Sequence, residues 1–201
     1  MASQNEIANW ACDLIGEPTI DDISDTTERA TRLRNAWENC RDAALRARIW
    51  RFSIARDSLA VLAAAPAWGF DLQYQIAGDV VRVIQVDQFF PPPVLSDYVG
   101  ADTAYYRIEQ DKILTNIAAP LKVRWVLNSI AVGLWDPCFA RVMACDLADR
   151  VCTRLTESET IKARIKAERR DALGEASRAN ALEQPPAMIQ DSSWVASRFA
   201  V

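Results

Sequence analysis

The sequence predicts an α+β protein that is mainly α: an antiparallel helical bundle with a central β-rich elaboration and an extended C-terminal tail. Two observations predict this class. Apolar residues recur at helical spacing near both ends of the chain, whereas β-branched and aromatic residues concentrate in its middle. We therefore expect bundle helices in residues 1–48 and 128–183, the β-rich elaboration in residues 49–127, and the tail in residues 184–201.

Two helices are expected at the N-terminal end. Residues 4–15 repeat apolar side chains at helical spacing, and Gly16 supplies a C-terminal stop. The repeat consists of Ile7, Trp10, Ala11 and Leu14. A second helix runs from a cap in residues 25–28 to Ala47. Its apolar face consists of Ala30, Leu33, Trp37, Cys40, Ala44 and Ala47.

The middle of the chain favours strands because it is rich in β-branched and aromatic residues. The expected strands are residues 49–54, 71–76, 80–86, 105–109, 112–116 and 121–127. Residues 105–109 and 112–116 lie close enough to form a hairpin around Gln110 and Asp111. That turn lacks the glycine that a two-residue hairpin prefers, so its boundaries stay open.

Two further helices are expected near the C-terminal end. Asp136-Pro137 opens the first, which runs to Leu155 and is apolar around most of its circumference, as a central helix is. Residues 156–159 resemble a capping box for the second, which runs to Leu182. Its stripe of small apolar residues suits close packing on one partner helix. Gln184-Pro185-Pro186 then ends the helix.

The composition excludes several kinds of chemistry. The chain has 201 residues, of which 50% are hydrophobic and 25% charged, and it has no histidine. That rules out Ser-His-Asp and Cys-His catalysis and a Cys2His2 zinc site. No apolar run approaches the length of about 20 residues that a membrane span needs, and the start lacks a signal-peptide pattern. The five cysteines favour free thiols in a reducing cytoplasm.

Charge is spread unevenly along the chain. Residues 1–27 carry a net charge of −6, and residues 28–56 carry eight arginines and a net charge of +5. These two segments could face each other, within one subunit or between subunits. The arginines are otherwise typical of salt-bridged surface residues, with contact to DNA as the alternative.

The sequence gives little support for a metal site or a catalytic site. Cys138, Cys145 and Cys152 are seven residues apart, and two helical turns separate their side chains by about 10 Å, too far to share one zinc ion. The acidic residues between Glu17 and Asp25 lack the glycine-bearing loop pattern of an EF-hand. No phosphate-binding loop or G-x-G-x-x-G motif is present. We expect no catalytic residue, no metal site and no cofactor.

A basic stripe on the last helix has two interpretations. Lys162, Lys166, Arg169 and Arg170 follow one another at i, i+4, i+7 and i+8 and span roughly 80° of the helix. They form either a surface that faces DNA phosphates or a solvated face opposite the alanine stripe. Trp194 in the tail also has two interpretations. Its side chain either folds back on its own helices or inserts into the interface with another protein, where tryptophan and arginine are favoured.

The order of these parts resembles the head-to-tail adaptors of short-tailed bacteriophages, the tail tubular protein A family. The resemblance covers nearly the whole chain and rests on the order and spacing of short motifs. These are Leu14-Ile15-Gly16-Glu17-Pro18, Ile49-Trp50-Arg51-Phe52, Asp79-Val80-Val81-Arg82-Val83, Trp135-Asp136-Pro137-Cys138-Phe139 and Asp191-Ser192-Ser193-Trp194 ahead of Arg198. The middle of the chain, including residues 64–69 and 91–93, departs from the family pattern.

The resemblance implies a structural protein of the virion and not an enzyme. Members of this family form a ring, usually of twelve subunits, below the portal protein. The ring extends the channel for packaged double-stranded DNA, receives the tail nozzle protein on its lower face, and is assembled in the host cytoplasm without a membrane. Their C-terminal tail docks between portal subunits, which makes Trp194, Arg198 and Phe199 the expected portal-binding residues.

Two other functions remain as hypotheses. One is a DNA-binding module that uses the stripe of Lys162, Lys166, Arg169 and Arg170. The other is a hydrolase with a carboxylate mechanism, for which the sequence offers no carboxylate pair of suitable context.

Overall fold

The helices begin where the sequence supplies capping side chains. The computed structural model describes residues 2–89, 105–156 and 158–183, so the predicted tail at 184–201 lies outside the described residues. Helix α1 (Gln4–Ile15) starts at a capping box between Ser3 and Glu6 and ends at Gly16, whose φ is 80°. Helices α2 (Glu28–Ala47) and α3 (Pro137–Leu155) are capped by Thr27 and Asp136. These three helices have the predicted bounds.

Helix α4 (Glu159–Leu182) ends at the predicted residue, but it starts two residues later than a capping box beginning at Thr156 would place it. The cap is Ser158, whose side chain accepts a hydrogen bond from the backbone N–H of Ile161. The predicted capping box from Thr156 to Glu159 is wrong, because the Thr156 hydroxyl donates to the carbonyl of Cys152 at 3.0 Å and so belongs to the end of α3.

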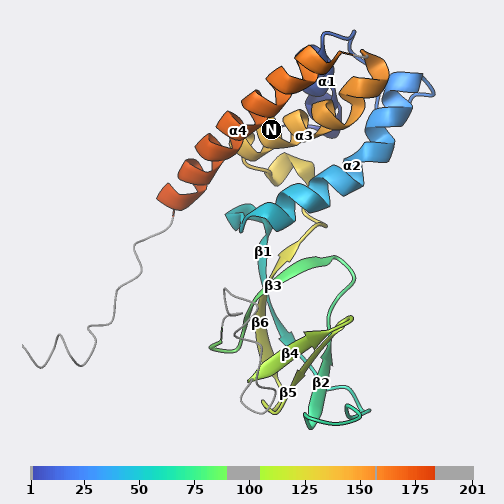
Figure 1. Ribbon diagram of the computed structural model, residues 1–201. Coiled ribbons are helices and arrows are strands. Elements are labelled where there is room, and N and C mark those ends of the chain that lie inside the picture. The colour runs from blue at the N-terminus through green and yellow to red at the C-terminus, as the bar shows by residue number, and fades with distance from the viewer. Residues whose placement is uncertain (1, 90–104, 157, 184–201) are drawn as a thin grey trace, which may run out of the picture.

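Helix α3 is the centre of the helical lobe. Ten of its residues are buried, and it packs against α1, α2 and α4 (Figure 1). Side chains on α4 reinforce this packing: Arg169 forms an ion pair with Asp146, and Arg141 pairs with Glu175 at 2.6 Å. The nearly all-round apolar character of α3 explains why it is surrounded by the other helices.

The expected fold class is wrong in its main architectural claim. The described residues form a mixed α+β fold of four helices and two three-stranded antiparallel sheets, and not a clear antiparallel helical bundle. The physical reason lies in α3. In an up-and-down bundle each helix packs against two neighbours, whereas here α3 packs against all three other helices and α1 and α4 contact each other only weakly.

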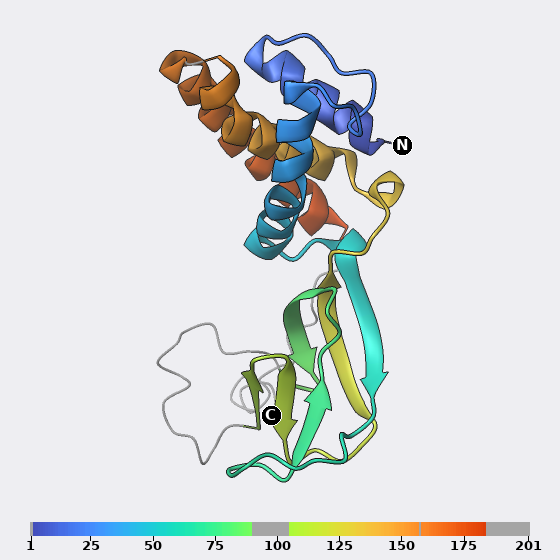
Figure 2. The same cartoon turned by 90° about the vertical axis from the view of Figure 1, so that its right-hand side faces the viewer.

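The strands form a second lobe with its own core (Figure 2). One sheet has the order β1-β6-β3, from Ile54–Leu59, Leu121–Leu127 and Val80–Val86. The other has the order β2-β5-β4, from Leu72–Gln75, Lys112–Thr115 and Tyr106–Glu109. Their buried side chains form one cluster: Tyr74, Val83, Val86, Ile113, Leu121, Val123 and Trp125. The β lobe therefore has a hydrophobic core of its own, separate from the core of the helices.

Strand β1 starts later than predicted. The expected strand over residues 49–54 is wrong, because Trp50 is buried and residues Arg51–Ser53 form a 3-10 turn. The turn is closed by the Ser53 hydroxyl, which donates to the Trp50 carbonyl at 2.8 Å. Burial of Trp50 in the helical core requires the chain to bend here before it enters the sheet.

An aromatic cluster anchors the two chain segments that join the lobes. Trp50 and Phe52 lie just before β1, and Trp135 lies after β6. All three contact the helical core: Trp50 and Phe52 approach Phe139 with ring centroids 5.0 and 4.9 Å apart. Trp135 stacks on Trp37 at 5.8 Å. Both connections are thereby fixed to α2 and α3.

The sheet β1-β6-β3 also contacts the helices directly. Because alternate residues of a strand face opposite sides, Val83 and Trp125 enter the β core while Ile84 and Val126 join the helical core. The rest of that outer face, farther from the helices, carries polar side chains.

Helix α1 buries Ile7 and Ala11 as predicted, but not Trp10. Trp10 is 40% exposed, whereas Ala8 and Cys12 are fully buried beside Ile7 and Ile15. The small residues meet α3 at close range, which leaves the large indole at the rim of the helical lobe.

Candidate functional site

The residues predicted to bind the portal cannot be placed. Trp194, Arg198 and Phe199 lie outside the described residues. The structure does describe the end of α4, which immediately precedes residues 184–201. At the end of α4, Ala181, Leu182 and Glu183 are exposed, and the Leu182 side chain is 86% exposed.

The predicted basic stripe on α4 is divided by its local contacts. Lys162 donates from Nζ to the hydroxyl of Thr153 at 2.8 Å, and Arg169 is bound to Asp146 on α3. Lys166 and Arg170 are exposed and have no hydrogen bond or ion pair within the described part of the chain. The four residues therefore do not form a uniform cationic surface.

The pair Arg169–Asp146 is part of the α3–α4 interface. Burial raises the pKa of the Asp146 carboxyl above its ordinary value, and the hydrogen bond from Arg169 acts in the opposite direction. The same hydrogen bond raises the pKa of Arg169. The Arg169 guanidinium balances the charge of a largely buried carboxylate and is held in place by helix packing. It is therefore poorly available to a DNA phosphate.

Most arginines of the basic segment 28–56 are used within the subunit. Arg29 pairs with Glu17 at 3.3 Å, which brings the acidic start of the chain onto α2. Arg34 donates to the carbonyl of Ile23 at 3.0 Å. Arg46 donates to the carbonyl of Val81 at 2.9 Å and so links α2 to the β lobe.

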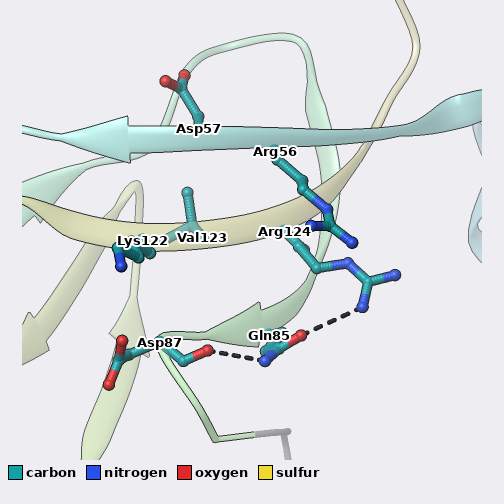
Figure 3. A pocket seen from close by; sticks show the side chains of 7 residues that line it. All are labelled: Arg56, Asp57, Gln85, Asp87, Lys122, Val123 and Arg124. Carbon is teal, nitrogen blue, oxygen red and sulfur yellow. Dashed lines mark hydrogen bonds between the residues drawn. The ribbon is translucent and has the colours of Figure 1, made fainter.

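Arg56 lies instead on the outer face of the sheet β1-β6-β3, in an open pocket of about 340 Å³ (Figure 3). Its lining comes from all three strands and consists of Arg56, Asp57, Gln85, Asp87, Lys122, Val123 and Arg124. Arg56 is directly opposite Arg124 on β6, and Arg124 is opposite Gln85 on β3. Figure 3 shows the two guanidinium groups on the same side of the sheet, with Asp57 extending to the other side.

Hydrogen bonds hold one of these arginines in position. Gln85 donates from Nε2 to the Asp87 carbonyl at 2.7 Å, and its Oε1 accepts from Nη1 of Arg124 at 3.2 Å. The Arg124 Nε–H is buried and has no acceptor within the described residues. A charged donor in that state is costly to the fold. The exposed guanidinium that the pocket presents to solvent is that of Arg56.

Sequence reasoning missed this pocket. The alternation in residues 121–127 did place Lys122 and Arg124 on one face. The register that brings Arg56 and Gln85 beside them depends on strand pairing between distant segments, which no local pattern specifies.

A second open pocket, of about 250 Å³, lies between α2 and α3. Its charged lining residues are Arg32, Arg150 and Arg154, with Asn35 and Asn39 between them. Arg32 is bound to Glu28 at 2.9 Å, so the cationic charge of this groove is partly compensated.

The cysteines lie in the helical core. Cys145 and Cys152 are fully buried and Cys138 is partly buried. Burial raises the pKa of the Cys40 and Cys145 thiols to about 11. Among the described residues, no group of histidine, cysteine and acidic side chains could hold a metal ion, and no helix is both long and apolar enough to cross a bilayer.

No protein-family model matches the chain, and no curated protein sequence is significantly similar to it.

Proposed function

We propose that the chain is a structural subunit of a bacteriophage head-to-tail connector. In this role it forms a ring in the virion, binds the portal protein above it, extends the DNA channel and supports the tail nozzle protein. The ring has twelve subunits in the family that the sequence resembles. The function is assembly rather than catalysis.

The course of α4 is the observation that supports this proposal best. The helix projects from the helical lobe, and near its end Asn180 donates to the Ile49 carbonyl at 2.9 Å (Figure 1). Beyond Asn180, Leu182 is 86% exposed. The end of α4 is therefore accessible to a second protein, and the sequence that follows contains tryptophan and arginine, which favour interfaces.

The decisive experiment mixes the purified chain with the portal ring of the same phage and images the product by electron microscopy. We expect a second ring stacked on the portal. A variant truncated after Glu183 should keep its circular dichroism spectrum and melting temperature but lose portal binding. Trp194→Ala and Phe199→Ala should each weaken binding, and Trp68→Ala, an exposed tryptophan of the β lobe, is the matched control.

Two results would contradict the proposal. One is a folded chain that does not associate with the portal. The other is a truncated chain that binds the portal as tightly as the full-length chain, since the tail would then not be the anchor.

The DNA-binding alternative has less support. Two of its four proposed residues, Lys162 and Arg169, have partners within the subunit. A DNA-binding helix needs cations that remain available to phosphates.

A further inference from the structure

Arg56 and Arg124 on the sheet β1-β6-β3 have no part in the tail-mediated contact proposed above. Several of their N–H donors have no acceptor among the described residues. Arg56 has no hydrogen bond or ion pair to any described residue, and the buried Nε–H of Arg124 has no acceptor among them. Arg124 is also held in one orientation by Gln85 at 3.2 Å. The pocket thus offers several charged donors that point the same way and are partly preorganised.

The two arginines also repel each other. They occupy directly opposed positions on neighbouring strands, where like charges destabilise a sheet. Lys122 is two residues from Arg124 on the same face of β6, so a third cation lies nearby. An anion bound between Arg56 and Arg124 would relieve the repulsion and accept hydrogen bonds from the exposed Arg56 guanidinium.

The surroundings favour a carboxylate on a protein over the backbone of a nucleic acid. Asp87 lines the same pocket as the three cations, so the lining is of mixed sign. A DNA strand carries one phosphate for about every 3.4 Å of helix axis and would bring further negative charges against that aspartate. One carboxylate needs only the paired guanidinium groups, which match its planar geometry.

We infer that this sheet face is a docking site for an acidic segment of a protein partner, with one carboxylate held between Arg56 and Arg124. The partner segment presents glutamate or aspartate to the sheet. It is a different contact from the tail docking of the proposed function, so each can fail without the other.

The test uses the full-length chain, labelled with nitrogen-15, and a capped eight-residue peptide in which glutamate and serine alternate. NMR spectra report the arginine Nε–H groups directly. We expect the Arg124 Nε–H resonance to move as the peptide is added, because a carboxylate bound beside the guanidinium changes the electrostatic environment of its Nε–H. The same peptide with glutamine in place of glutamate should leave it unchanged.

Variants then locate the site. Arg56→Gln and Arg124→Gln should each weaken peptide binding by about tenfold, the effect of losing one charge-assisted contact. Arg82→Gln is the matched control, because Arg82 is an exposed arginine of β3 outside the pocket, and it should change the affinity less than about twofold. Arg56 is exposed and unpaired among the described residues, so its replacement tests the site even where Arg124→Gln perturbs the fold.

Three outcomes would overturn the inference. The first is an Arg124 Nε–H resonance that does not respond to the glutamate peptide. The second is equal weakening by Arg82→Gln, which would mean diffuse electrostatic attraction without a site. The third is a different occupant: a 12-base-pair DNA duplex that shifts the same resonance more strongly than the peptide, or a dimer of this chain that Arg124→Gln dissociates.

Discussion

Asn180 near the end of α4 binds the backbone on both sides of Trp50. Its Oδ1 accepts from the backbone N–H of Arg51 at 3.0 Å, and its Nδ2 donates to the carbonyl of Ile49 at 2.9 Å. One side chain therefore satisfies two backbone groups at the place where the chain leaves the helical lobe for β1. The same residue ties the last turn of α4 to this segment.

We expect Asn180→Ala to lower the free energy of unfolding by about 1–2 kcal/mol, because two hydrogen bonds are lost. Urea denaturation measures this change, and hydrogen exchange of the Arg51 amide should accelerate. Asn180→Asp keeps the acceptor for that amide and serves as the control. Unchanged exchange in the alanine variant would show that the contact does not hold the segment.

Phe139 lies among Trp50, Phe52 and Trp135 and is fully buried. Phe139→Ala should cost about 3–5 kcal/mol through the cavity it creates. Leu134→Ala changes a side chain that is 65% exposed and should stay within about 0.5 kcal/mol of the native stability. Thermal or urea unfolding compares the two, and a similar loss in both would argue against the aromatic anchor.

Arg169→Ala should destabilise the protein by roughly 1–3 kcal/mol near pH 7, since it leaves the Asp146 carboxylate without its cation. The loss should depend on pH. Burial raises the pKa of Asp146 above 3.8, and removal of Arg169 raises it further, because the opposing hydrogen bond is gone.

The sign follows from proton binding. Between the ordinary pKa and the raised pKa, the folded state binds more protons than the unfolded state, so stability falls as pH rises through that window. The penalty of Arg169→Ala should therefore shrink as the pH is lowered from 7 towards about 4. Urea denaturation at both pH values tests this. In an Asp146→Asn background the pH dependence should disappear, and its persistence would assign it to another group.

Thiol reactivity should be low in the folded protein. Burial holds the pKa of Cys40 and Cys145 at about 11 and also raises the pKa of Cys12 and Cys138. A disulfide reagent such as DTNB at pH 8 should therefore modify at most the partly buried Cys138 quickly, and all five cysteines once urea unfolds the chain. Rapid modification of two or more thiols in the folded protein would contradict the described core.

Lys166 and Arg170 allow the DNA alternative to be tested without disturbing the α3–α4 interface. We expect the isolated chain not to bind a duplex at about 50 mM salt, because half of the stripe is engaged internally. Fluorescence anisotropy measures this. Binding that has a steep salt dependence and is removed by Lys166→Glu with Arg170→Glu would favour the DNA module instead.

Local patterns predicted the elements well where each element carries its own signals. The bounds of α1, α2 and α3 and the end of α4 follow from caps and apolar spacing, and the hairpin of β4 and β5 was expected. Trp10 and the 49–54 segment were predicted wrongly for a shared reason. In both cases packing against α3 or its neighbours decided which side chain is buried, and periodicity within one segment does not contain that information.

The sequence by itself determined where helices and strands form, that α3 is central, and that the chain lacks histidine chemistry. Only the tertiary structure decided that the strands form two sheets around a separate core and that three helices surround α3. It also decided that Arg56 and Arg124 face each other and that Arg169 is bound to Asp146. The reason is physical: caps and periodicity act over a few residues, whereas strand register and ion pairing between helices join residues that are distant in the chain.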